Sequence, residues 1–177
     1  MKETTISGVK LELKRGDIAN QKDCDAVVNA ANAQLRMGGG VAGAIHRGAG
    51  PELEKETRPL APIQPGEAVI TGGYNLPNKY IIHCLGPVYG RDQPEDKLLA
   101  NCYKNALDRA EENEIECVAF PAISTGAFGY PTEEASHVAL STVKEKMKDL
   151  RHVKTIRFVL WGEEMMNIHE QVMDELF

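Results

Sequence analysis

The stretch NAANAQLRMGGGVAGAIHRGAG, residues 29–50, carries six glycines within its last thirteen residues. Glycine loses more backbone entropy on folding than other residues, so such a cluster indicates either positive φ angles or a close approach of the main chain to a ligand. Asn29 and Asn32 precede the glycines, and residues 42–46 can begin a helix. A glycine-rich turn at a helix N-terminus directs free N–H groups at a bound group, and phosphate and ribose suit that position. The alternative is a surface loop without a ligand.

Predicted strands and helices alternate on both sides of this stretch. Apolar or alternating runs predict strands over residues 9–14, 26–28, 67–71, 80–85, 117–120 and 155–161. Helices are predicted over residues 43–48, 51–57 and 163–176, with two further helices beginning at Pro94 and Pro131. This order predicts an α/β fold with a largely parallel sheet covered on both faces, with residues 9–14 as an edge strand. The length of 177 residues predicts one domain, residues 1–177.

Composition excludes several classes of function. The net charge of −6 disfavours nucleic acid as a partner, because phosphate backbones attract basic surfaces. No apolar run approaches the length of a membrane span, so we expect no membrane association. The four cysteines, Cys24, Cys84, Cys102 and Cys117, lie far apart without a C-x-x-C motif. We interpret them as reduced core residues of a cytoplasmic protein, and we expect no metal site because no Cys/His cluster exists.

Four unusual segments follow predicted strands: residues 15–18, 29–43, 121–130 and 161–163. Ligands of open α/β sheets bind at the loops that leave the carboxyl ends of the strands. The four segments are therefore predicted to meet at one edge of the sheet and to form a single site.

Individual motifs leave alternatives open. Residues 38–43 match G-x-G-x-x-G, but the preceding strand ends too far upstream for a dinucleotide-binding turn. Ser124 is not in a G-x-S-x-G elbow, so we interpret residues 124–129 as a backbone cradle for phosphate rather than as a nucleophile site. Trp161 either packs in the core or stacks on a base. Asp17 either caps a turn or binds a ligand. His46 and His83 are interpreted as structural.

Several motifs in order resemble the macrodomain family, and in particular its MacroD-type branch. They are Gly16-Asp17-Ile18, Val28-Asn29-Ala30-Ala31-Asn32, Gly38-Gly39-Gly40-Val41, Gly43-Ala44-Ile45-His46-Arg47, Ala49-Gly50-Pro51, His83 with Gly86-Pro87-Val88, and Pro121-Ala122-Ile123-Ser124-Thr125-Gly126 with Gly129-Tyr130-Pro131. The resemblance extends from about residue 10 to the C-terminus. It implies an α/β/α sandwich around a six-stranded mixed sheet, and a site for ADP-ribose.

The resemblance also implies roles for single residues. Asp17 would accept a hydrogen bond from the adenine amino group beside the Ile18 backbone, and Trp161 would lie against adenine. Asn32 would bind the distal ribose, with Asn29 supporting the loop. The distal ribose and one phosphate would be enclosed by Gly39, Gly40 and Val41. The diphosphate would be held by the main chain of Ser124, Thr125, Gly126, Ala127 and Phe128, with Phe128 shaping the ribose pocket.

One residue departs from the resemblance. MacroD-type enzymes that remove ADP-ribose from acidic side chains usually have aspartate directly after Gly-Gly-Gly-Val, where this chain has Ala42. Other branches with alanine at this position still hydrolyse. The resemblance thus implies an ADP-ribosyl-ester hydrolase acting on ADP-ribosylated proteins or O-acetyl-ADP-ribose, with Asn32 and Gly40 positioning the water. The alternatives are a non-catalytic ADP-ribose reader and an RNA- or protein-binding regulator. We expect no cofactor and a monomer.

Overall fold

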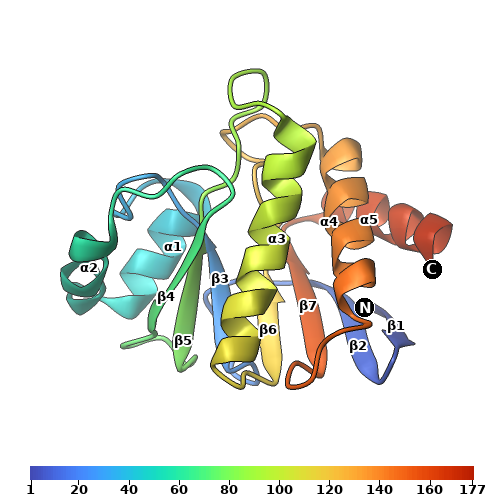
Figure 1. Ribbon diagram of the computed structural model, residues 1–177, viewed down its shortest axis with the longest axis horizontal. Helices are drawn as coiled ribbons and strands as arrows, with labels where there is room; N and C mark the ends of the chain where they lie inside the picture. Colours follow the sequence, from blue (N-terminus) through green and yellow to red (C-terminus); the bar gives the residue numbers. More distant parts are fainter.

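The computed structural model covers residues 1–177 and contains one seven-stranded sheet, in the order β1-β2-β7-β6-β3-β5-β4 (Figure 1). The strands are β1 (Lys2–Ile6), β2 (Val9–Arg15), β3 (Ala26–Ala30), β4 (Ala68–Gly72), β5 (Tyr80–Cys84), β6 (Cys117–Phe120) and β7 (Thr155–Leu160). The five inner strands, β2, β7, β6, β3 and β5, are parallel to their neighbours among themselves. The outer strands β1 and β4 are antiparallel to the strands beside them.

The helices are α1 (Gly40–Ala49), α2 (Glu52–Thr57), the short 3-10 helix η1 (Arg58–Leu60), α3 (Glu95–Glu112), α4 (Thr132–Lys146) and α5 (Glu163–Leu176). Apolar side chains of α3, α4 and α5 pack on one face of the sheet in the larger core cluster, and in Figure 1 α3 and α4 lie in front of the strands. On the other face, α1 and α2 contribute Ile45, Ala49 and Leu53 to a smaller cluster. None of the helices combines the length and the apolar character that crossing a membrane requires.

The predicted three-layer α/β sandwich is confirmed, but the strand count of six is wrong. Residues 2–6 form the additional strand, joined to β2 by a two-residue hairpin turn at Ser7 and Gly8. Both turn residues have positive φ angles, 54° and 78°, as a tight hairpin turn requires. Because β1 covers one side of β2 and β7 the other, β2 is an inner strand, and the prediction that residues 9–14 form an edge was also wrong.

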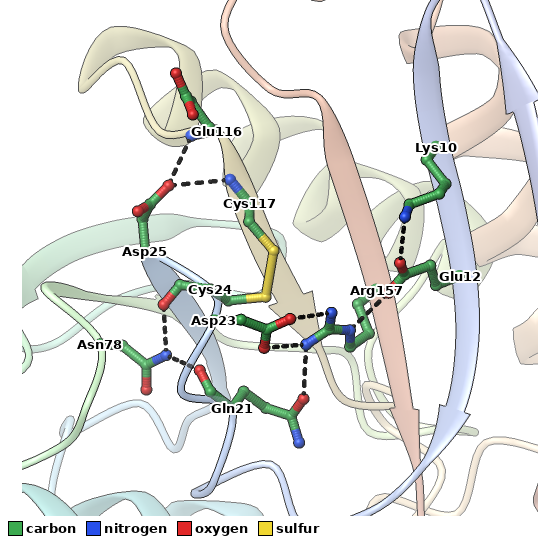
Figure 2. The surroundings of a disulfide bond; sticks show 10 residues. All are labelled: Lys10, Glu12, Gln21, Asp23, Cys24, Asp25, Asn78, Glu116, Cys117 and Arg157. Atoms are coloured by element: carbon green, nitrogen blue, oxygen red, sulfur yellow. Dashed lines mark hydrogen bonds and ion pairs between the residues drawn. A yellow bond between two sulfur atoms is a disulfide. The ribbon is translucent and has the colours of Figure 1, made fainter. Parts of the chain in front are cut away.

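The prediction of four reduced cysteines is wrong for one pair. Cys24, just before β3, and Cys117, the first residue of β6, form a disulfide across 93 positions of sequence (Figure 2). Sequence spacing gives no sign of this bond, because the two residues become neighbours only through the pairing of β3 with β6. Cys84 and Cys102 are free and buried, as predicted.

An ion-pair network lies beside the disulfide (Figure 2). The guanidinium of Arg157, on β7, donates from Nε to Glu12 at 2.7 Å and from two further nitrogens to Asp23 at 2.7 and 2.6 Å. Glu12 also contacts Lys10, and Gln21 accepts from Arg157 at 3.1 Å. Arg157 and Glu12 are 5% and 4% exposed, so both charges depend on these partners. The network therefore fixes the segment before β3 to the strands β2 and β7.

Asp25, which follows Cys24, attaches the start of β3 to the start of β6. One carboxylate oxygen of Asp25 accepts hydrogen bonds from the main-chain N–H groups of Glu116 and Cys117, at 3.0 and 3.1 Å. β3 and β6 share only two registered residue pairs. The disulfide and Asp25 thus strengthen the shortest strand pairing of the sheet at the amino ends of its strands.

Candidate functional site

The predicted segments do meet at one edge of the sheet. Residues 15–18, 161–163, 121–130 and 29–43 follow β2, β7, β6 and β3, which are consecutive parallel strands, so the segments leave the sheet side by side at its carboxyl edge. Their spatial order places residues 15–18 and 161–163 at one end, residues 121–130 in the middle and residues 29–43 at the other end. The site is therefore elongated along the edge of the sheet.

Asp17 and Trp161 form the first end. The N–H of Gly16 donates to the carbonyl of Leu160 at 3.1 Å, which brings the residues that follow, Asp17 and Trp161, close together. One carboxylate oxygen of Asp17 accepts from the N–H of Ala19 at 2.9 Å, and the other has no partner in the chain. Asp17 thus caps a turn and retains a free acceptor. Trp161 is 81% exposed, which rules out core packing and leaves an aromatic face available for stacking.

Residues 121–130 form the middle of the site. The hydroxyl of Ser124 is buried and donates to the carbonyl of Pro87 at 2.8 Å, so it is already bonded within the chain. The main-chain N–H groups of Ser124, Gly126, Ala127 and Phe128 make no hydrogen bond within the chain. Backbone donors without a partner cost free energy unless water or a ligand satisfies them. Backbone N–H groups in such a row can bind an anion, for example a diphosphate, without a side-chain cation.

Residues 38–43 lead into α1 at the far end of the site. The helix begins at Gly40, three residues earlier than predicted, with Gly39 before it in an extended conformation. The N–H groups of Gly40, Val41 and Ala42 therefore belong to the first turn and have no partner within the helix. A Cβ atom at Gly43 would lie 2.5 Å from the carbonyl oxygen of Gly38, so only glycine lets the loop fold this closely onto α1.

Ala42 lies in α1, in agreement with the expectation that residues 42–46 begin a helix. It is buried in the first helical turn, and the first turn of α1 contains no acidic residue. A position in the first turn favours a negative charge, because the free N–H groups there carry partial positive charge. Ala42 is thus placed where a carboxylate would be stabilised.

Asn32 closes the loop between β3 and the glycines. Its side-chain oxygen accepts from the N–H of Arg36 at 3.0 Å, and its amide nitrogen donates to the carbonyl of Arg36 at 2.8 Å. Asn32 is half-buried, and its amide retains a second N–H and a second lone pair for a ligand. The two bonds to Arg36 fix the direction in which this amide faces.

Asn29 lies beneath the loop in a buried polar cluster on the α1 face of the sheet. Its amide nitrogen donates to Nδ1 of His83 at 3.1 Å, and Nε2 of His83 bonds to the Thr71 hydroxyl at 2.9 Å. Burial, with a further effect of the neighbouring His46, lowers the pKa of His83 to about 3, so the ring stays neutral and bridges the two side chains. The amide of Asn29 is therefore bonded to β5 in the protein interior, and its side-chain oxygen has no partner within the chain.

His46 occupies the next turn of α1 beyond Ala42. It is buried, its Nε2 has no hydrogen-bond partner within the chain, and its ring centre lies 6.5 Å from that of His83. Burial lowers the pKa of His46 as well. Neither histidine presents a charged group to the site.

A fifth segment, residues 86–93 after β5, was not predicted to join the site. The N–H of Tyr89 donates to the carbonyl of Phe128 at 2.9 Å, which ties this segment to the middle of the site. A Cβ atom at Gly86 would overlap the Ser124 hydroxyl, so glycine is required at this position. The Gly86-Pro87-Val88 motif was the only sequence signal for this contact.

These features define an α/β protein with an elongated site at the carboxyl edge of its parallel strands. The site offers an aromatic face and a carboxylate at one end, free N–H donors in the middle, and a glycine-rich turn with an asparagine amide at the other end. An aromatic face suits a base, N–H donors suit phosphate, and amides suit ribose hydroxyl groups.

Comparison with known proteins identifies the family. The family model of the Macro domain matches residues 28–139, and the chain belongs to the macrodomain family. A macro domain-containing protein of Methanosarcina mazei is 47% identical over 165 residues, covering 89% of this chain and 88% of that protein. Human ADP-ribose glycohydrolase MACROD2 is 47% identical over 173 residues, covering 95% of this chain and 40% of that protein. The chain therefore spans about two fifths of MACROD2.

Solved structures agree with this family. A mutant of the Oceanobacillus iheyensis macrodomain with ADPR superposes with a TM-score of 0.94 at 36% identity, covering 99% of this chain and 97% of that one. The Trypanosoma brucei macrodomain in complex with ADP-ribose has a TM-score of 0.86 at 35% identity, covering 92% of this chain and 68% of that one.

Proposed function

We propose that the chain binds ADP-ribose along the carboxyl edge of its sheet. The observation that carries this proposal is the row of unpartnered N–H groups in residues 124–128, placed between the Asp17–Trp161 end and the Asn32–glycine end. Adenine would stack on Trp161, and its amino group would donate a hydrogen bond to Asp17. The diphosphate would accept hydrogen bonds from the free N–H groups. The distal ribose would contact Asn32 and the turn at Gly39, Gly40 and Val41. The related macrodomains solved with ADPR or ADP-ribose support this choice of ligand.

We further propose that the chain hydrolyses the ester between the distal ribose of ADP-ribose and a carboxylate, either on a protein side chain or as acetate. Water would attack at C1″ as the bond from C1″ to the ester oxygen breaks, and the carboxylate would leave with the electron pair. No acidic residue lies in the first turn of α1, so the proton of the water would pass to a phosphate oxygen of the ligand. Asn32 and Gly40 would contribute by positioning the reactants. The relatives named ADP-ribose glycohydrolase support this type of reaction.

A second candidate function is a reader that binds ADP-ribosylated proteins without turnover. Ala42 favours it, because the first turn of α1 then lacks a group that can activate water. Both functions share the same ligand site and differ only in the chemical step.

Two measurements test these proposals. Calorimetry is expected to give a micromolar dissociation constant for ADP-ribose, about −7 to −8 kcal/mol, and a much weaker one for NAD, whose nicotinamide would crowd the glycine turn. Equal affinities would show that the distal ribose is not enclosed. Single-turnover hydrolysis of a glutamate-linked ADP-ribosylated protein then separates the enzyme from the reader. Asn32→Ala is expected to reduce binding and turnover together, because the same contact serves both.

A further inference from the structure

A polar cavity adjoins the loop that carries Asn32. It has a volume of about 320 Å³ and is lined by Gln34, Arg36, Glu54, Thr57, Arg58 and Ala61. The lining comes from the loop after β3 on one side, and from α2, η1 and the residue after η1 on the other. In Figure 1 these segments lie together at the left of the sheet. None of the six residues belongs to the ADP-ribose site described above.

The walls of this cavity are fixed by buried contacts. The Thr57 hydroxyl donates to the carbonyl of Leu35 at 2.9 Å, and the N–H of Ile63 donates to the carbonyl of Ala33 at 3.0 Å. Leu35 and Ile63 are buried together in a small apolar cluster. The loop therefore holds a defined position against α2, and the cavity is a built feature of the fold.

The charged groups of the cavity have no partners within the chain. Arg36 and Arg58 are exposed, and neither guanidinium takes part in an ion pair or a hydrogen bond. The half-buried carboxylate of Glu54 likewise has no ion-pair partner. On a chain with a net charge of −6, two unpaired guanidinium groups beside one carboxylate give this cavity a local charge of opposite sign. Carboxylates are the side chains that guanidinium groups bind best.

The cavity is also next to the end of the site where a carrier protein would be attached. Both main-chain polar atoms of Arg36 are bonded to the side chain of Asn32, at 2.8 and 3.0 Å. If Asn32 holds the distal ribose, a peptide joined to that ribose leaves the site beside Arg36.

We propose that this cavity, the Arg36–Arg58 pocket, receives acidic residues that flank the ADP-ribosylated side chain of a protein substrate. The inference rests on the proposed function, because it uses the position of the distal ribose. The two guanidinium groups bind the flanking carboxylates, and Glu54 accepts an N–H of the peptide backbone. A polyphosphate or a nucleic acid offers acceptors but few donors at its backbone and is repelled by Glu54, so a peptide fits the pocket better.

Two peptides with ADP-ribose attached through a hydrolysis-resistant linkage test this inference. One has aspartate and glutamate on both sides of the modified residue, and the other has asparagine and glutamine at the same positions. We expect the parent protein to bind the acidic peptide about three- to tenfold more tightly, a range set by two exposed ion pairs. The preference should weaken at higher salt. In R36Q/R58Q we expect the preference to vanish, while the affinity for free ADP-ribose stays within about twofold.

The matched control is K148Q/R151Q, which removes two exposed positive charges that form no ion pair and that lie just before β7, at the amino edge of the parallel strands. It should keep the preference for the acidic peptide. Equal binding of the two peptides by the parent would overturn the inference while leaving ADP-ribose binding intact. Equal loss in the control variant would also overturn it, because the effect would then come from total charge. If the parent fails to bind free ADP-ribose, the proposed function fails first, and the inference fails with it.

Discussion

The two ends of the parallel strands are built in opposite ways. At the amino ends, a disulfide, a buried guanidinium with two carboxylate partners and a carboxylate on two N–H groups tie β3 to β6, β7 and β2. At the carboxyl ends, the same strands lead into segments with unpartnered N–H groups, a free carboxylate oxygen and an exposed indole. The amino end pairs its charged side chains within the chain, and the carboxyl end leaves main-chain N–H groups without a partner in the chain.

This difference indicates that the groups that stabilise the sheet and the groups proposed to bind the ligand lie at opposite edges of the same strands. Unpaired backbone donors at the carboxyl edge lower stability. Covalent and ionic links at the amino edge hold the same strands together at a distance from the ligand. Substitutions at the amino edge should therefore change the free energy of unfolding and leave ligand affinity unchanged, and substitutions at the carboxyl edge should do the reverse.

The largest expected effect is at Arg157. Arg157→Met leaves the carboxylate of Glu12 buried with Lys10 as its only partner, and we expect the free energy of unfolding to fall by about 3–5 kcal/mol. ADP-ribose affinity, measured at a temperature where the variant is folded, should be unchanged. Glu12→Leu combined with Arg157→Met is the control, since it removes both buried charges and should recover most of the loss. A parallel loss of affinity would show that the two ends are coupled.

The ion pair between Arg157 and Asp23 also predicts that the free energy of unfolding depends on pH. The hydrogen bond from Arg157 holds the pKa of Asp23 at about 2, below the ordinary value of 3.8. Because the pKa is depressed in the folded state, this contribution is fully present above the unfolded pKa and is lost as the pH falls through about 2. Arg157→Met should remove that part of the acid dependence, which denaturant titrations between neutral and acidic pH would measure.

The disulfide should have the next largest effect. Cys24→Ser with Cys117→Ser opens a loop of 93 positions and should lower the free energy of unfolding by about 2–4 kcal/mol, again without a change in ADP-ribose affinity. Reductant should lower the melting temperature of the parent and leave that of the double variant unchanged. Four free thiols in the denatured, unreduced parent would contradict the bond.

At the carboxyl edge the expected effect is on binding. Asp17→Ala removes the carboxylate proposed to accept from adenine, and ADP-ribose should bind about 1.5–3 kcal/mol less tightly. The free energy of unfolding should change by no more than about 1 kcal/mol, because the substitution removes only an exposed capping hydrogen bond from the N–H of Ala19. Asp17→Asn, which keeps an oxygen for the turn, separates the two roles. If calorimetry shows an unaltered affinity for ADP-ribose while the melting temperature falls sharply, Asp17 acts only as a cap of the turn.

The smallest expected effect is on the chemical step. Ala42→Asp adds a carboxylate in the first turn of α1 and should raise single-turnover hydrolysis of a glutamate-linked ADP-ribosyl ester by at least about tenfold, a bound set below the about 10²–10⁴-fold typical of general-base catalysis. Affinity for ADP-ribose should change little, or fall slightly through repulsion of the diphosphate. Ala42→Asn matches the aspartate in size without its charge. A parent that already turns over well and gains nothing from Ala42→Asp would show that water is positioned without this carboxylate.

The sequence by itself determined the class of fold and the ligand edge. Local signals sufficed for both, since alternation and helical spacing depend on neighbouring residues, and parallel strands bring their carboxyl ends to one edge. The glycine cluster and the loop at 121–130 were thus predicted to meet at the carboxyl edge, where the structure places both. The strand β1 was missed although Lys2–Ile6 alternates in exposure, because its partner strand was taken as the edge.

Only the tertiary structure decided how individual side chains are used. The bond between Cys24 and Cys117, the partners of Arg157 and the burial of Asn29 against His83 all join residues that are far apart in sequence. Trp161 illustrates the same limit, since a tryptophan at a strand end is compatible with the core and with the surface, and packing places it at 81% exposure. Periodicity reports which face of an element is buried, but the neighbours across that face are set by how the elements pack.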